Sequence, residues 1–87
     1  MNEITEEKLN KYFALTEKAL KEVRIKNKQA EKLIDMSKRY FSDAKHFREK
    51  GKIAEAFAAV NYAHAFLDAA ALLGYLENKD NKLFMVG

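Results

Sequence analysis

Residues 51–74 read GKIAEAFAAVNYAHAFLDAAALLG, and this stretch decides the fold. It contains no proline, and a glycine stands at each end. Because glycine readily adopts the left-handed conformation that ends helices, Gly51 and Gly74 are expected to terminate this helix and the one before it. The apolar seam of the stretch is made mostly of small side chains at helical spacing: Ala56, Ala59, Val60, Ala63, Leu67 and Ala70. The spacing predicts a helix over about 53–73 that packs closely against other helices.

The residues before Gly51 carry two further helical patterns. Thr5 is expected to N-cap a helix over about 6–24, with Glu6 and Glu7 in the first turn, where the helix dipole favours negative charge. A second helix is expected over about 29–50. The apolar positions are Leu9, Tyr12, Phe13, Thr16, Ala19, Leu20 and Val23 in the first, and Ala30, Leu33, Ile34, Ser37, Tyr40, Phe41, Ala44 and Phe47 in the second.

These patterns predict one all-α domain over residues 1–87, folded as a three-helix up-and-down bundle. The boundary between the first two helices is weak, since the apolar spacing continues in phase from Val23 to Ala30 and Asn27 is the main breaker between them. One long helix plus a second helix, stabilised as a dimer, is therefore an alternative. A turn would let one chain cover its own core, which favours three helices. Residues 83–86, LFMV, are expected to pack back as an apolar flap.

Composition limits the class of protein. The chain has 87 residues, enough for one core, and no cysteine, which suits a reducing cytoplasm. Its first residues are polar and acidic, unlike a secretory signal. The longest apolar stretch, residues 53–76, includes Glu55, Asn61, His64 and Asp68. These side chains argue against a membrane span, because one central aspartate costs about 2.5–3.5 kcal/mol on insertion. We expect a cytoplasmic protein without a membrane partner.

The basic residues concentrate in one region. The net charge is +3, but residues 38–52 alone hold six Lys or Arg against two Asp or Glu. The six form a candidate basic patch: Lys38, Arg39, Lys45, Arg48, Lys50 and Lys52. Such a patch is compatible with weak, sequence-independent nucleic-acid binding, although a patch of this kind is more often an ordinary solvated helix face.

The helix expected over 53–73 has more apolar surface than one side of a three-helix bundle needs. The surplus residues form a candidate interface: Phe57, Tyr62, Phe66, Leu72 and Leu73. Either the flap or a second subunit would cover them. We therefore expect a small helical protein-interaction module that associates with itself, as a homodimer or larger, or binds another protein.

A polar stripe is expected opposite the small-residue seam, at Asn61, His64 and Asp68. His64 and Asp68 lie four residues apart, so the carboxylate can orient the imidazole or both can bind one ligand. With Asp43 and Tyr62 they form a candidate polar ligand or metal site, and the alternative is plain bundle surface. No cofactor or metal is assigned. Without cysteine, a glycine-rich phosphate loop or a base beside Ser37 or Ser42, we expect no enzyme.

Four short motifs lie between residues 40 and 64: Tyr-x-x-Asp-Ala at 40–44, Phe-x-x-Lys-Gly at 47–51, Ala-Phe-Ala-Ala at 56–59 and Tyr-Ala-His at 62–64. Together they resemble an archaeal family catalogued as domain of unknown function 357. The resemblance implies a three-helix bundle from an archaeal cytoplasm with no established activity. The family frequently has glycine after this histidine, where Ala65 stands here.

Overall fold

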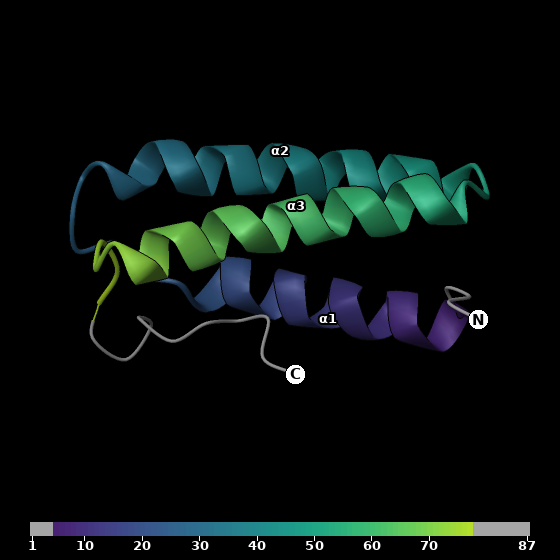
Figure 1. Ribbon diagram of the computed structural model, residues 1–87, viewed down its shortest axis with the longest axis horizontal. Helices are drawn as coiled ribbons and strands as arrows, with labels where there is room; N and C mark the ends of the chain where they lie inside the picture. The colour runs from purple at the N-terminus through teal and green to yellow at the C-terminus, as the bar shows by residue number, and fades with distance from the viewer. Residues whose placement is uncertain (1–4, 78–87) are drawn as a thin grey trace.

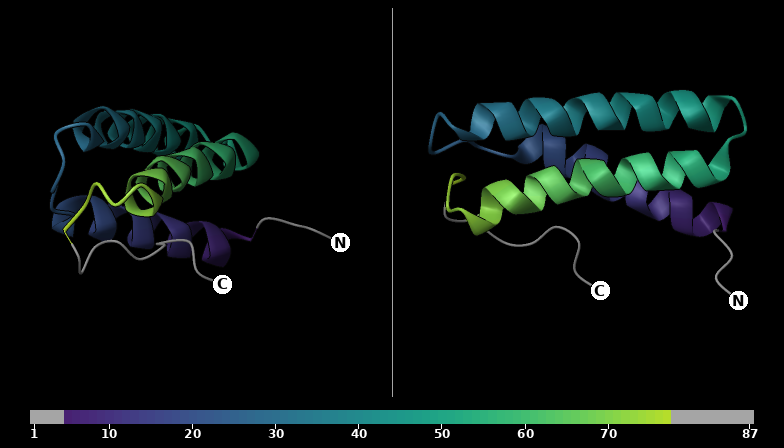
Figure 2. Two further views of the ribbon diagram at one scale, coloured as in Figure 1. Left: turned by 60° about the vertical axis from the view of Figure 1, so that its left-hand side comes forward. Right: turned by 45° about the horizontal axis from the view of Figure 1, so that its top comes forward.

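The computed structural model describes residues 5–77, which form three helices: α1 (Glu6–Glu22), α2 (Ala30–Glu49) and α3 (Ile53–Leu72). α1 and α3 run in one direction along the long axis of the bundle, and α2 runs in the opposite direction between them in the chain (Figure 1). α2 and α3 pack against each other along their length, and α1 lies across one side of this pair, mainly against α3 (Figure 2). The prediction of an all-α three-helix bundle is confirmed.

The link between α1 and α2 is a true turn that pairs with the segment after α3. The backbone N–H groups of Lys26 and Asn27 both donate to the carbonyl of Tyr75, at 2.8 and 2.9 Å. In the other direction, the N–H of Glu77 donates to the carbonyl of Arg24 at 2.9 Å. These bonds give residues 24–27 backbone partners outside any helix, so the alternative of one long helix is wrong.

Two side chains complete this turn. Leu76 lies within the paired segment, opposite Ile25, and is fully buried, so it anchors the segment after α3 in the core. The Asn27 carboxamide oxygen accepts a 2.8 Å hydrogen bond from the N–H of Gln29, which leads the chain into α2. Asn27 therefore acts as the local breaker that its sequence position suggests.

Both predicted glycine stops are confirmed. Gly51 has φ +75° and Gly74 has φ +71°. After α2, the N–H of Gly51 donates to Arg48 and the N–H of Lys52 donates to Phe47, the two bonds of a Schellman motif. The same pattern follows α3. At the start of α1, the Thr5 hydroxyl accepts the N–H of Lys8 at 3.0 Å, which confirms the predicted cap.

All six seam residues of α3 are buried, and their small side chains bring α3 close to α2. The core divides into two apolar clusters along the bundle, one around Phe13 and Phe41 and one around Ile34 and Leu67. The predicted flap at 83–86 lies outside the described residues. Between residues 5 and 77, none of the helices has the length and apolar character needed to cross a membrane.

Candidate functional site

Three aromatic side chains form a stack on the side of the α2–α3 pair that α1 does not cover. The Tyr40 ring of α2 lies 5.2 Å from the Tyr62 ring and 5.6 Å from the Phe66 ring, measured between centroids, with interplanar angles of 29° and 18°. Tyr62 and Phe66 share one side of α3 because they are four residues apart. Tyr62 remains 57% exposed although it is stacked. We call this side of α2 and α3 the outer face.

A cavity of about 240 Å³ lies at one end of the outer face, near the α2–α3 turn. Its lining residues are Tyr40, Asp43, Phe47, Glu55, Ala58, Ala59 and Tyr62. The two carboxylates are exposed, and within residues 5–77 neither Asp43 nor Glu55 forms a salt bridge. We call this cavity the acidic end of the outer face. Its floor is apolar, and the residues that line it include two carboxylates and no cation.

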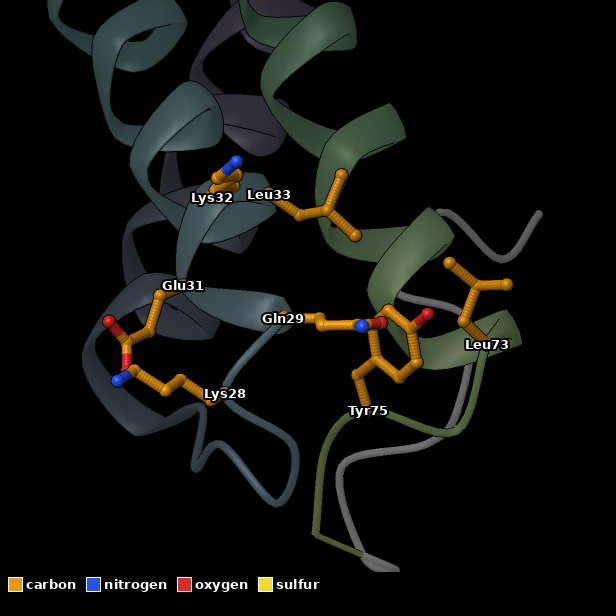
Figure 3. Close-up of a pocket in the computed structure, with 7 residues that line it drawn as sticks. All are labelled: Lys28, Gln29, Glu31, Lys32, Leu33, Leu73 and Tyr75. Atoms are coloured by element: carbon orange, nitrogen blue, oxygen red, sulfur yellow. The ribbon is translucent and has the colours of Figure 1, made fainter.

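A larger cavity, of about 630 Å³, lies at the opposite end (Figure 3). Leu33 near the start of α2, together with Leu73 and Tyr75 just after α3, contributes apolar surface to its lining. The remaining lining residues are Lys28, Gln29, Glu31 and Lys32. Two lysines and one glutamate give this end, which we call the basic end, a net charge of +1, opposite in sign to that of the acidic end. In Figure 3 the side chains of Lys28 and Glu31 lie together on the side of α2 away from Leu33, Leu73 and Tyr75.

Helical spacing shows that the two cavities and the stack belong to one surface. On α2, Leu33, Tyr40 and Phe47 recur every seven residues and so lie on one side of the helix. On α3, Tyr62, Phe66 and Leu73 do the same at spacings of four and seven. The outer face thus carries aromatic and aliphatic side chains along two helices, with an acidic end and a basic end.

The structure divides the interface that the sequence predicts. Tyr62, Phe66 and Leu73 lie on the outer face, but Phe57 does not. Phe57 packs against Tyr12 of α1, with ring centroids 5.3 Å apart, and the Lys8 ammonium lies 5.5 Å from its ring centroid. Leu72 is 74% exposed and lines neither cavity. The α2 members of the outer face, Leu33, Tyr40 and Phe47, fit a core pattern equally well, and Tyr75 lies beyond the helix expected over 53–73. Their place on this face therefore could not be told from the sequence.

His64 is fully buried, so the expected polar stripe on the solvent side of α3 is wrong at this position. The reason is that α1 crosses this side of α3 and places Tyr12 edge-on against the imidazole, with centroids 6.2 Å apart. Within the described residues neither ring nitrogen makes a well-formed hydrogen bond. Burial lowers the pKa of His64, against weaker raising effects of the Tyr12 backbone and the Asp68 carboxylate. The ring is therefore neutral at pH 7.

The four residues of the predicted polar site do not come together. Asp43 and Tyr62 line the acidic end, whereas His64 faces α1 on the other side of α3. Asp68 is half-buried and close enough to influence His64 electrostatically. Among residues 5–77, no three His, Cys, Asp or Glu side chains are arranged to hold a metal ion. Of the four predicted residues, only Asp43 and Tyr62 line the same cavity.

The predicted basic patch is also divided. The Arg48 guanidinium lies 3.8 Å from the Phe13 ring centroid and donates to the Asn10 side chain at 3.5 Å, so it helps to join α2 to α1. The Lys45 ammonium lies 5.1 Å from the Phe41 ring centroid. Arg39 pairs with Asp35 at 3.2 Å. The remaining members, Lys38, Lys50 and Lys52, are exposed.

A comparison with known families matches residues 11–76 to a family described as Protein of unknown function (DUF357). Neither the curated proteins nor the solved structures gave a match. The matched region contains all of α2 and α3, most of α1, and Tyr75 and Leu76 of the segment that pairs with the α1–α2 turn. It covers more than half of the chain, and the resemblance carried by the motifs at residues 40–64 is confirmed. The chain therefore belongs to the DUF357 family.

Proposed function

We propose that this protein is a small helical interaction module that docks another protein chain on its outer face. The observation that carries the proposal is the Tyr62–Tyr40–Phe66 stack, in which Tyr62 stays 57% exposed and Tyr40 and Tyr62 line the cavity of the acidic end. Exposed apolar strips of this kind mark interaction sites in soluble domains, and tyrosine is among the residues that contribute most to binding at interfaces.

The stack also suits docking because it is already ordered. Tyr40 is half-buried between two rings, so a partner that covers the strip loses little side-chain entropy in fixing them. Tyr62 and Leu73 are 57% and 58% exposed, and their remaining apolar surface would be removed from water in a complex. That the chain is not an enzyme stays a prediction, as do an archaeal origin and a cytoplasmic location.

A photo-crosslinking pair tests the docking face in the native cell. Benzoylphenylalanine replaces Tyr62 in one variant and Leu72 in the other. Both positions are well exposed on α3, but only Tyr62 lies on the outer face. We expect protein adducts from position 62 and none, or far fewer, from position 72. Absence of an adduct at position 62, or equal yields at the two positions, would contradict the proposal.

Weak nucleic-acid binding through the basic residues of α2 stays a second proposal with less support. Arg39, Lys45 and Arg48 already contact a carboxylate or an aromatic ring of this chain. If about four phosphates are neutralised, log affinity should fall against log salt with a slope of about −3 to −4 on duplex DNA. A complete lack of gel retardation at low salt would reject this proposal.

A further inference from the structure

We infer that the partner that fits the outer face is a second copy of this chain, placed antiparallel about a two-fold axis close to the Tyr40 ring. The inference rests on the proposed docking function and specifies its partner. Its basis is the opposite charge of the two ends of one apolar strip. The acidic end carries Asp43 and Glu55, and the basic end carries Lys28 and Lys32 against Glu31.

A two-fold interface brings the same patch of both subunits together, so the patch must complement itself. For an elongated strip, an antiparallel arrangement places the first end of each copy over the second end of the other. Here it would set each pair of lysines against the partner's two carboxylates. A parallel arrangement would oppose like charges at both ends, which costs binding free energy.

The positions along the helices agree with such an axis. Lys32 and Asp43 are separated by about 16 Å along α2 at 1.5 Å per residue, and their midpoint lies within one turn of Tyr40. On α3, Glu55 and Leu73 lie at the two ends of the strip, and their midpoint falls between Tyr62 and Phe66. Along α2, Tyr40 is nearer to Asp43, three residues away, than to Lys32, eight residues away, whereas on α3 the stack lies midway between Glu55 and Leu73. An axis near the midpoint of Lys32 and Asp43 brings each Lys32 close to the partner's Asp43 while the two stacks lie beside each other.

The apolar floor of the acidic end also suits a lysine from a second copy. A lysine has a four-carbon stem and a charged tip, so it can cover aromatic surface while its ammonium reaches a carboxylate. At the acidic end, Phe47 and Tyr62 supply such surface beside Asp43 and Glu55. The flexible lysines at the basic end of a second copy match this combination of ring and carboxylate.

Charge reversal and complementation test the arrangement. One variant carries Asp43→Lys and Glu55→Lys, and the other carries Lys28→Glu and Lys32→Glu. We expect the wild-type protein to be a dimer by light scattering at micromolar concentration. The dimer dissociation constant of each variant alone should rise at least about tenfold, because both ends of its outer face then carry charge of the same sign. An equimolar mixture of the two variants should form a heterodimer.

A variant with Glu17→Lys and Glu22→Lys is the matched control. It changes the net charge by the same amount as the acidic-end variant, but both positions are exposed on α1. It should dimerise like the wild type, and circular dichroism should show all variants to be helical. High salt screens these charges, so it should bring the dimer dissociation constants of the two charge-reversed variants closer to that of the wild type.

Three results would overturn the inference: a monomeric wild type, variants that dimerise normally on their own, or a mixture that does not pair. A monomeric wild type is also the result expected if residues 83–86 cover the strip. The docking function is judged separately by the crosslinks. Adducts at position 62 with a different protein would keep the docking function and reject the self-partner, whereas no adducts there would reject both.

Discussion

The hydroxyl of Ser37 in α2 donates a 2.7 Å hydrogen bond to the backbone carbonyl of Ala63 in α3, and both residues are fully buried. The bond joins the two helices at the point where the small-residue seam of α3 allows a close approach. A buried hydroxyl needs a partner, so this one fixes how α2 and α3 are aligned along their axes.

Replacement of Ser37 by alanine should lower the free energy of unfolding by about 1 kcal/mol, the usual net value of one such bond. The Ala63 carbonyl still lies within α3 after the substitution, and no charged group is left without a partner. Urea denaturation of Ser37→Ala beside Ser42→Ala, whose position is exposed, measures the difference. Equal midpoints for the two variants would show that the bond does not stabilise the bundle.

The seam itself predicts a size limit at Ala63. An Ala63→Leu variant should lose about 1–3 kcal/mol of stability because the larger side chain separates α3 from α2. Ala65→Leu is the matched control, since position 65 is exposed on the same helix and leucine favours helix nearly as well as alanine. Thermal melts compare the two. A stable Ala63→Leu variant would mean that the helices are not packed closely at this point.

The buried His64 predicts a pH dependence of stability. Its pKa is lowered in the folded protein from the ordinary value of 6.5, because burial opposes protonation. The unfolded chain then binds a proton that the folded chain does not, so stability is fully present above pH 6.5 and falls as the pH drops below it. The loss levels off once the folded histidine is protonated too.

Urea midpoints at several pH values between about 5 and 8, above the ordinary carboxylate range, would reveal this loss. His64→Leu should remove most of the slope, because leucine is apolar and of similar size. His46→Gln, at an exposed position, is the matched control. A wild-type protein whose stability is flat over this range would contradict the buried neutral state of His64.

Replacement of either helix-ending glycine should lower the stability of the fold through the backbone conformation. A Cβ added at Gly51 or Gly74 would meet no other atom within 4 Å, so only the positive φ resists a side chain. Alanine at either position should cost about 1–2 kcal/mol. Asparagine tolerates this conformation better and should cost less. Calorimetry of the alanine and asparagine variants gives the comparison, and an alanine variant as stable as the wild type would argue against these turns.

The sequence predicted those features that depend on neighbouring residues. Thr5 and the two glycines are local signals, and the seam of α3 follows from helical spacing alone. The burial of His64 was not predictable in this way, because it depends on the side of α3 that α1 crosses. The position of Phe57 was misjudged for the same reason.

The acceptor role of Tyr75 was also invisible in the sequence. It serves residues of the α1–α2 turn that are far away along the chain, and no local pattern marks a backbone carbonyl as their partner. The outer face was only half predicted. Its α3 members stood out as surplus apolar residues, whereas Leu33, Tyr40 and Phe47 of α2 have the same spacing as core residues.

The pairing of Ile25 with Leu76 has a consequence for the order of folding. The contacts between α2 and α3 are local, because a short turn joins the helices, whereas the Ile25–Leu76 pair closes a loop that contains both. Closing the longer loop costs more chain entropy, so the α2–α3 hairpin should form first and α1 should dock late. Destabilising substitutions at Leu9 should then mainly accelerate unfolding, whereas those at Val60 should mainly slow refolding in stopped-flow measurements.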